Sequence, residues 1–149
     1  MLRPNRLALA ILTLASFGLI AEGHAQPPQT MGLFLNAPGS FNGYTLIPSQ
    51  SFPATYLIDN GGLLVHSWPH VWGGASAYLL ENGHLVRGAA RDNTWGAPGR
   101  LGAVEDYDWD GNLVWEYVYN DSIVRHHHDH DVLPNGNVLI LAWEKKFSA

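Results

Sequence analysis

The chain has 149 residues, a formal net charge of −5 and no cysteine. A length of about 100–200 residues is typical of one domain, and without cysteine no disulfide can hold that domain together. The acidic balance and the lack of any basic run argue against a nucleic acid or an anionic membrane as the main partner. Six tryptophans, six tyrosines and sixteen glycines favour turns and cross-strand aromatic packing over helices.

The first 25 residues predict a removable export signal. Arg3 and Arg6 precede an apolar run, Leu7–Ile20, and the small residues that end at Ala25 suit a signal peptidase. The run is too short for a lasting membrane anchor, since a spanning helix needs about 20 apolar residues. We therefore expect cleavage near Ala25, no stable membrane anchor, and a periplasmic or extracellular protein.

Residues 26–40 are rich in proline and glycine and predict an irregular arm, whereas residues 41–149 repeat one hairpin unit. Asn-Gly or Asp-Gly stands between short apolar runs four times, with spacings of 22, 28 and 25 residues. This dipeptide is a strong hairpin signal, because a two-residue turn needs positive φ at both positions. The four turns are Asn60-Gly61, Asn82-Gly83, Asp110-Gly111 and Asn135-Gly136.

These hairpins predict an all-β fold, because no window after the signal shows a sustained helical period. Two hairpins make one four-stranded blade, so the chain predicts a partial β-propeller of about two to three blades, with a β-sandwich as the alternative. Closed propellers use about four to eight blades, so self-association could cover the open blade edges. The segment Asn137–Leu141 is predicted to be a buried strand.

Half of the eight histidines stand in the segment His126–Asp131, which predicts a functional site. Alternation on a strand would place His126, His128 and His130 on one face and His127, Asp129 and Asp131 on the other. The first set has the number of imidazoles of a transition-metal site, but same-face neighbours lie about 7 Å apart. The second set pairs an imidazole with carboxylates that can orient it. A catalytic or anion-binding site, a metal site and a solvated strand end remain open.

The turn sequence Asp106-Tyr107-Asp108-Trp109-Asp110-Gly111 resembles the opening of a calcium loop. The acid expected at the twelfth position falls on Tyr117, so a helix-loop-helix calcium site is excluded. One hypothesis is a short hairpin in which Asp106, Asp108 and Asp110 bind calcium. The alternative hypothesis is that Asp108 and Asp110 are turn residues and that Asp110 caps its own backbone.

Arginines and further histidines give weaker signals. Arg91 and Arg100 flank a glycine-rich loop, and either guanidinium could bind a sulfate or phosphate through paired donors. His66 and His70 lie near tryptophans and are predicted to be packing or surface residues rather than ligands.

From Gly32 to about Glu144, the chain resembles the arylsulfotransferase (aryl-sulfate sulfotransferase) family, as an N-terminal portion or a truncated member. The matching stretches are Gly43–Leu46, Tyr56–Asp59, Val65–Trp68, Tyr78–Gly83, Leu85–Arg87, Asp108–Asn112, Val114–Tyr117, His127–Asp129, Leu133–Val138 and Ala142–Glu144. The resemblance implies a six-bladed propeller that moves a sulfuryl group from a phenolic sulfate ester to a phenol through a sulfohistidine. It implies no nucleotide sulfate donor and no cofactor, with phenols and aryl sulfates as partners.

The same resemblance gives roles to residues of this chain. It implies that His127 and His128 are catalytic, with His128 the first choice for contacting the sulfate, and that Arg87 and Asp129 bind substrate. The family's modified histidine and a sulfate-binding arginine are expected from later blades, so this chain could hold only part of the site. The alternative function is a non-catalytic exported binding module with a calcium or transition-metal site.

Overall fold

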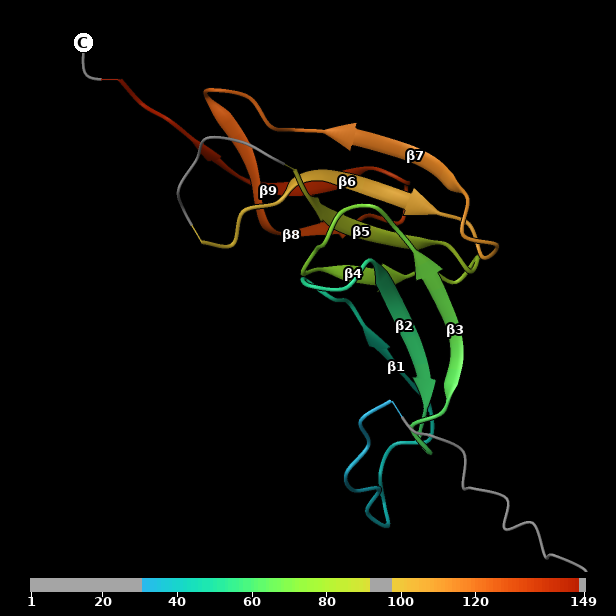
Figure 1. Ribbon diagram of the computed structural model, residues 1–149. Coiled ribbons are helices and arrows are strands. Elements are labelled where there is room, and N and C mark those ends of the chain that lie inside the picture. Colours follow the sequence, from blue (N-terminus) through green and yellow to red (C-terminus); the bar gives the residue numbers. More distant parts are fainter. Residues whose placement is uncertain (1–30, 92–97, 148–149) are drawn as a thin grey trace, which may run out of the picture.

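The computed structural model describes residues 31–91 and 98–147, and every regular element in them is a β-strand (Figure 1). The nine strands of these residues form antiparallel sheets of three, four and two strands, each paired in sequence order. The strands are β1 (Tyr44–Ile47), β2 (Ala54–Asp59), β3 (Leu64–Pro69), β4 (Ala77–Leu79), β5 (Leu85–Ala90), β6 (Gly102–Tyr107), β7 (Leu113–Val118), β8 (Val124–Val132) and β9 (Val138–Glu144). The all-β prediction is confirmed, while the grouping into propeller blades stays a prediction.

The predicted export signal, residues 1–25, lies outside the described residues. The described part of the predicted arm, residues 31–40, forms no strand, and the Met31 N–H donates to the Gly62 carbonyl at 2.7 Å. In the part of the chain that the structure describes, no helix has the length and apolar character needed to cross a membrane.

All four predicted hairpins form, but the predicted turn geometry is wrong. Among the described residues, His128 is the only non-glycine residue with positive φ, so the Asn and Asp turn residues do not adopt it. In each turn the N–H of a positive-φ glycine donates to the carbonyl three residues earlier, as from Gly83 to Leu80 at 2.9 Å. A glycine in the left-handed region is the signature of the three-residue hairpin loop. In the first hairpin this residue is Gly62, with φ of 75°, one position after the predicted Gly61.

The main apolar core lies between the three-stranded and the four-stranded sheet. Trp68 of β3 is fully buried and packs with Leu57, Leu85 and Tyr107. In Figure 1 the strands of the first sheet run steeply below the stacked strands β4 to β7, so β3 and the ends of β5 and β6 meet at this core. The core therefore joins two sheets that are consecutive in sequence.

The tip of the β6–β7 hairpin docks onto the same end of β3. The Trp68 indole Nε1–H donates to the Asp108 carbonyl at 3.0 Å, and His66 Nε2 lies 2.7 Å from the Trp109 carbonyl. The rings of His66 and Trp109 stack with centroids 4.2 Å apart. His66 is thus a packing residue, as predicted.

Strand β5 is covered on both faces, because its residues alternate between two neighbouring layers. Leu85 faces the core around Trp68, whereas a methyl group added to Gly88 would lie 3.2 Å from the His126 ring. Its partner β6 is buried along almost its whole length as well. The second sheet therefore has neighbours on both sides at its centre.

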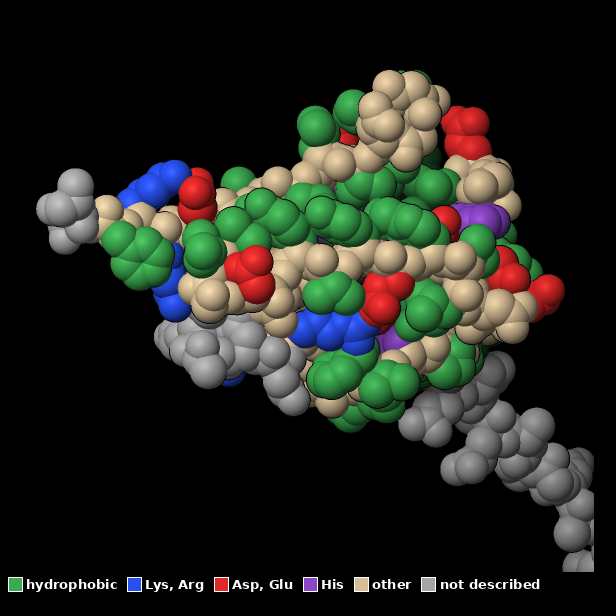
Figure 2. Space-filling model, turned by 90° about the horizontal axis from the view of Figure 1, so that it is seen from above, with side chains coloured by type: hydrophobic (Ala, Val, Ile, Leu, Met, Phe, Trp, Pro, Cys, Tyr) green, Lys and Arg blue, Asp and Glu red, His purple; other side chains and the backbone are tan. Residues whose placement is uncertain are grey.

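The outer strands β7 and β9 are exposed. All six residues of β7 are exposed, and Figure 2 shows a band of hydrophobic side chains across the face seen from above, where Figure 1 places β7. In β9, Leu139 and Leu141 are 57% and 56% exposed, so the prediction of a buried strand over Asn137–Leu141 is wrong. Hydrophobic sequence predicted burial there, but no described element covers these side chains.

Candidate functional site

The histidine segment lies in β8, where a bulge breaks the strand alternation. His126 and His130, four positions apart, pair with Ala142 and Ile140, which are only two positions apart on β9. Two extra residues are therefore inserted into β8, and His128 takes a φ of 60°. Because of this bulge, His126, His128 and His130 do not share one face, and the prediction that they do is wrong. His126 and His130 are buried, whereas His128 is exposed.

A short segment from the preceding loop holds the other edge of this bulge. The Leu101 N–H donates to the His126 carbonyl at 3.1 Å, and the His128 N–H donates to the Gly99 carbonyl at 2.8 Å. Arg100 and His127 form an isolated antiparallel bridge between these two bonds. Backbone hydrogen bonds on both edges therefore fix the direction of the histidine side chains.

His126 is fully buried and has a structural role. Its Nδ1 lies 3.1 Å from the Ala103 carbonyl, and its Nε2 lies 3.0 Å from the Asp129 carbonyl inside the bulge. Burial lowers the pKa of His126, the largest effect, while the two carbonyls act in the opposite direction. The ring thus ties the bulge to β6 and has no nitrogen left for a ligand.

His127 and His128 form a directed hydrogen-bond chain. His127 Nε2 lies 3.0 Å from the Pro98 carbonyl, which can only accept, so this nitrogen carries the proton. Burial lowers the pKa of His127, so the ring is neutral near pH 7 and its Nδ1 is an acceptor. The Nδ1 atoms of the two rings are 2.7 Å apart, so His128 Nδ1–H donates. In the neutral tautomer that this bond selects, the His128 nitrogen without a proton is Nε2.

Two open hollows adjoin the exposed His128. One, of about 590 Å³, is lined by Gly73, Gly74, Gly99 and Arg100 among others, and a methyl group on Gly99 would lie 2.1 Å from the His128 ring. The other, of about 450 Å³, is lined by His128 itself with Asp129, Ser76 and Tyr78. Ala75 lines both hollows, and His128 lines the smaller one.

Asp129 lines the smaller hollow together with His128. Its Oδ1 accepts the Tyr78 hydroxyl at 2.8 Å and the His130 N–H at 2.9 Å. Behind it, the buried His130 places Nδ1 3.2 Å from Ser76 Oγ. The predicted residues His127, His128 and Asp129 are thus brought together with Tyr78, which the sequence analysis did not select.

Arg87 lies in the core of the second sheet rather than at the hollows. It is 1% exposed, and its guanidinium donates to Glu105 Oε2 at 2.5 Å and to the Trp72 carbonyl at 2.7 Å. Glu105, also 1% exposed, accepts from Arg91 and from the Tyr107 hydroxyl as well. The structure gives Arg87 an ion-pair role, and its predicted contact with substrate stays a prediction.

Arg91 and Arg100 differ in what surrounds them. Arg91 also pairs with Glu116 and lies 4.7 Å from the centre of the Trp72 ring, so its guanidinium is held by neighbours within the chain. Arg100 is exposed at the wall of the larger hollow. Of the two arginines considered for anion binding, Arg100 lies at the hollow beside His128.

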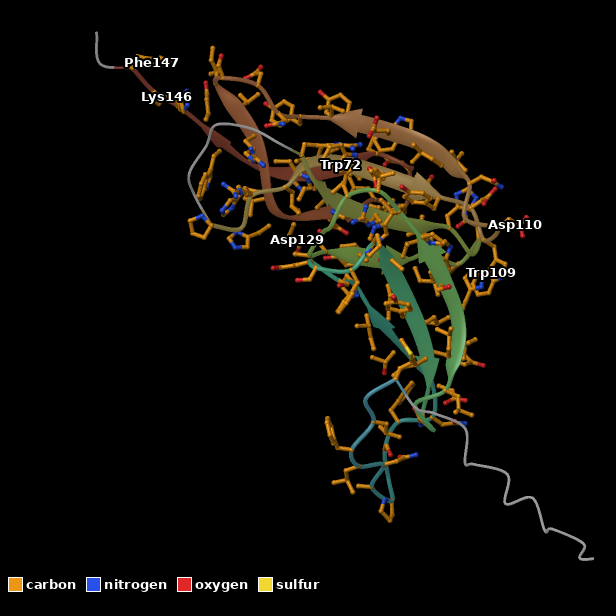
Figure 3. The ribbon with its side chains drawn as sticks, in the orientation of Figure 1. Trp72, Trp109, Asp110, Asp129, Lys146 and Phe147 are labelled. Carbon is orange, nitrogen blue, oxygen red and sulfur yellow. The ribbon has the colours of Figure 1, made fainter. Side chains whose placement is uncertain are left out.

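The predicted metal sets are not gathered in the structure. Within residues 31–91 and 98–147, no group of three His, Asp or Glu side chains is placed to hold a metal ion. Asp106 pairs with His84 at 2.9 Å, and Asp108 caps the turn by accepting the Asn112 N–H at 2.8 Å, a role predicted for Asp110. Figure 3 shows Asp110 and Asp129 well apart, at opposite sides of the four-stranded sheet, so the aspartate turn and the histidine segment are separate.

Trp143, Pro98 and Gly99 contribute to the site and were not predicted. The Trp143 ring of β9 stacks on His127 with centroids 3.7 Å apart, and Gly99 has a φ of 70°. Trp143 lies in one of the stretches that resemble the arylsulfotransferase family, and the glycine-rich loop was noted only for its arginines. The sequence spacing does not predict that these residues meet His127 and His128 from the two sides of β8.

Acid is expected to destabilise the fold before most carboxylates titrate. Burial, the largest effect, lowers the pKa of both His70 and His130 to about 4. The unfolded chain, with histidine pKa values near 6.5, therefore binds protons first as the pH falls. This stability is fully present above about pH 6.5 and is lost towards pH 4, by an order of 3 kcal/mol for each histidine. Urea unfolding between pH 7.5 and pH 4.5 measures the loss.

A His130→Leu variant serves as the control for this pH dependence. It removes one of the two titrating groups, so its stability is expected to fall less steeply over the same range. An equal slope in the variant and the original chain would contradict the assignment.

Comparison with known proteins gives a fold likeness only. No protein-family model and no curated protein matches the chain. A solved structure of a protein of unknown function from Bacteroides caccae aligns with a TM-score of 0.50 and 14% identity, over 68% of this chain and 34% of that one. The chain thus spans about a third of that protein's length, and the likeness concerns the arrangement of strands.

Proposed function

We propose that the chain carries a sulfuryl-transfer site of an arylsulfotransferase-like protein, with His128, rather than a histidine of a later blade, as the nucleophile. The observation that supports this most is the chain from the Pro98 carbonyl through His127 to His128. In a neutral ring it makes Nε2 of the exposed His128 the nitrogen without a proton, beside the hollow that His128 lines. A neutral imidazole nitrogen is a good nucleophile toward sulfur in an aryl sulfate.

His127 is a positioning residue in this proposal. As a hydrogen-bond acceptor it holds His128 in one tautomer, and it stabilises the positive charge that develops on that ring as the N–S bond forms. Stacking on Trp143 and the bond to Pro98 fix its own orientation. This is the support that an orienting group gives to a catalytic imidazole.

The charges around the hollows suit a sulfate ester. Arg100, at the wall of the larger hollow, can hold sulfate oxygens through paired donors. Asp129, exposed in the smaller hollow, can take the proton of an incoming phenol. The proposed partners are therefore phenols and aryl sulfates, with no cofactor.

We also propose that the sheets are blades of a partial propeller in an exported protein. The four-stranded sheet is a meander in sequence order, and its central strands are covered on both sides, as in a blade between two neighbours. The support for export is the sequence of residues 1–25. Neither proposal is needed for the chemistry at His128.

The function is tested with 4-nitrophenyl sulfate as donor and an added phenol as acceptor. The purified chain is expected to release nitrophenolate and to form the new aryl sulfate. His128→Ala should lower the rate by at least about 10³-fold, because it removes the nucleophile.

His66→Ala is the matched control, since His66 stacks on Trp109 and lies outside the hollows. It is expected to keep the rate of the original chain. Equal loss in both variants, or no turnover by the original chain, would defeat the transfer proposal and leave a non-catalytic binding module as the better reading.

A further inference from the structure

Tyr78 of β4 brings a phenol of the chain itself into the hollow that His128 and Asp129 line. Its hydroxyl donates to Asp129 Oδ1 at 2.8 Å, and its ring meets the buried His130 edge-on, with centroids 5.2 Å apart. Tyr78 as a whole residue is 39% exposed. The ring is therefore held in place while part of the residue remains open to solvent.

The contact with Asp129 is the one that an acceptor phenol needs. A phenol reacts with a sulfuryl group only as it loses its proton, and a carboxylate in hydrogen-bond contact can take that proton. The hydrogen bond to Asp129, the largest effect, raises the pKa of Tyr78, so the hydroxyl is protonated near neutral pH. Asp129 is exposed and follows His128 directly in the bulge.

We propose that Tyr78 is itself a sulfuryl acceptor, so that the protein sulfates its own tyrosine in the hollow beside His128. The proposal rests on the proposed function, because the sulfuryl group comes from an aryl sulfate through His128. It adds a modification site and identifies Asp129 as the base that serves an acceptor phenol. Without a competing phenol, transfer stops when Tyr78 is fully modified.

Atoms and electrons balance over two displacements. In the first, Nε2 of His128 bonds to sulfur, the S–O bond of the aryl sulfate breaks, and the phenolate leaves with the electron pair. In the second, the Tyr78 oxygen bonds to sulfur, the N–S bond breaks with its electron pair returning to His128, and Asp129 receives the hydroxyl proton. The product is a tyrosine O-sulfate, and no redox partner is required.

The test exposes the full chain to 4-nitrophenyl sulfate without an added phenol. We expect one equivalent of nitrophenolate and a mass gain of one SO₃ group, located on the Tyr78 peptide by mass spectrometry under conditions that preserve sulfate esters. Tyr78→Phe should lose this stable gain, and His128→Ala should lose both the gain and the release. Tyr44→Phe, at an exposed tyrosine outside the hollow, should retain the gain.

The outcomes separate this inference from the proposed function. Transfer to an added phenol with no modification of Tyr78 would overturn the inference and leave the function standing. A gain that persists in His128→Ala would also overturn it, because the sulfuryl group would then have come directly from solution. No release with or without a phenol would overturn both.

Discussion

Replacing Glu105 by alanine is expected to lower the free energy of unfolding by about 3–5 kcal/mol, the range found when one partner of a buried ion pair is removed. Glu105 holds the guanidinium of Arg87, and both residues are 1% exposed. Without the carboxylate, the buried charge of Arg87 keeps the Trp72 carbonyl as its one hydrogen-bond acceptor among the described residues. Since a domain is stable by about 5–15 kcal/mol, urea unfolding should show loss of a large part of the stability.

Two comparisons show whether this cost comes from the unpaired charge. Glu144→Ala removes an exposed carboxylate that pairs with Lys146, and it should cost less than about 1 kcal/mol. The double change Arg87→Met with Glu105→Leu removes both charges, so it should restore much of the stability. A Glu105→Ala variant as stable as Glu144→Ala would show that Arg87 is not held as the structure indicates.

We propose that copies of the chain associate through β7, so the molar mass in solution is expected to exceed that of one chain. This strand is an edge of the four-stranded sheet and exposes Val114 and Val118 at 55% and 52% and Trp115 at 42%. Its only charged residue, Glu116, pairs with Arg91, the residue that follows β5, and no proline or lysine protects the edge. An antiparallel edge can pair with its own copy about a two-fold axis, so sedimentation should give a dimer or larger species.

Lysine on β7 tests this association directly. Trp115→Lys places a charge on the edge and should shift the sedimenting species to the monomer. Tyr44→Lys changes another exposed aromatic residue, on β1 of the first sheet, and should leave the association intact. A monomer at all concentrations of the original chain would contradict the proposal.

The strands were predictable because their signals are local. Each hairpin is marked by an apolar run and a turn glycine, so the all-β fold and all four turns could be located from sequence. The exact turn type was missed, because Asn-Gly suits both a two-residue loop and the three-residue loop that formed. In the first hairpin two consecutive glycines allowed either Gly61 or Gly62 to close the turn.

The arrangement of the candidate site depends on contacts between distant residues, and there the sequence was less informative. His127 and His128 were selected, but alternation could not foresee a two-residue bulge paired on both edges. The partner of His127, Pro98, stands 29 positions earlier. Arg87 was selected as an available cation, whereas its pairing with Glu105 follows from the β5–β6 register.

The docking of the Trp109 hairpin tip onto β3 has a consequence for the order in which the chain folds. The first two sheets pair strands that are neighbours in sequence, and the second sheet is fastened to the first through Trp68 and His66. Pairing between strands that are neighbours in sequence keeps the entropic cost of loop closure small for a β protein. The chain can therefore fold from its amino end during synthesis, with each new hairpin packing against the hairpin that has already formed.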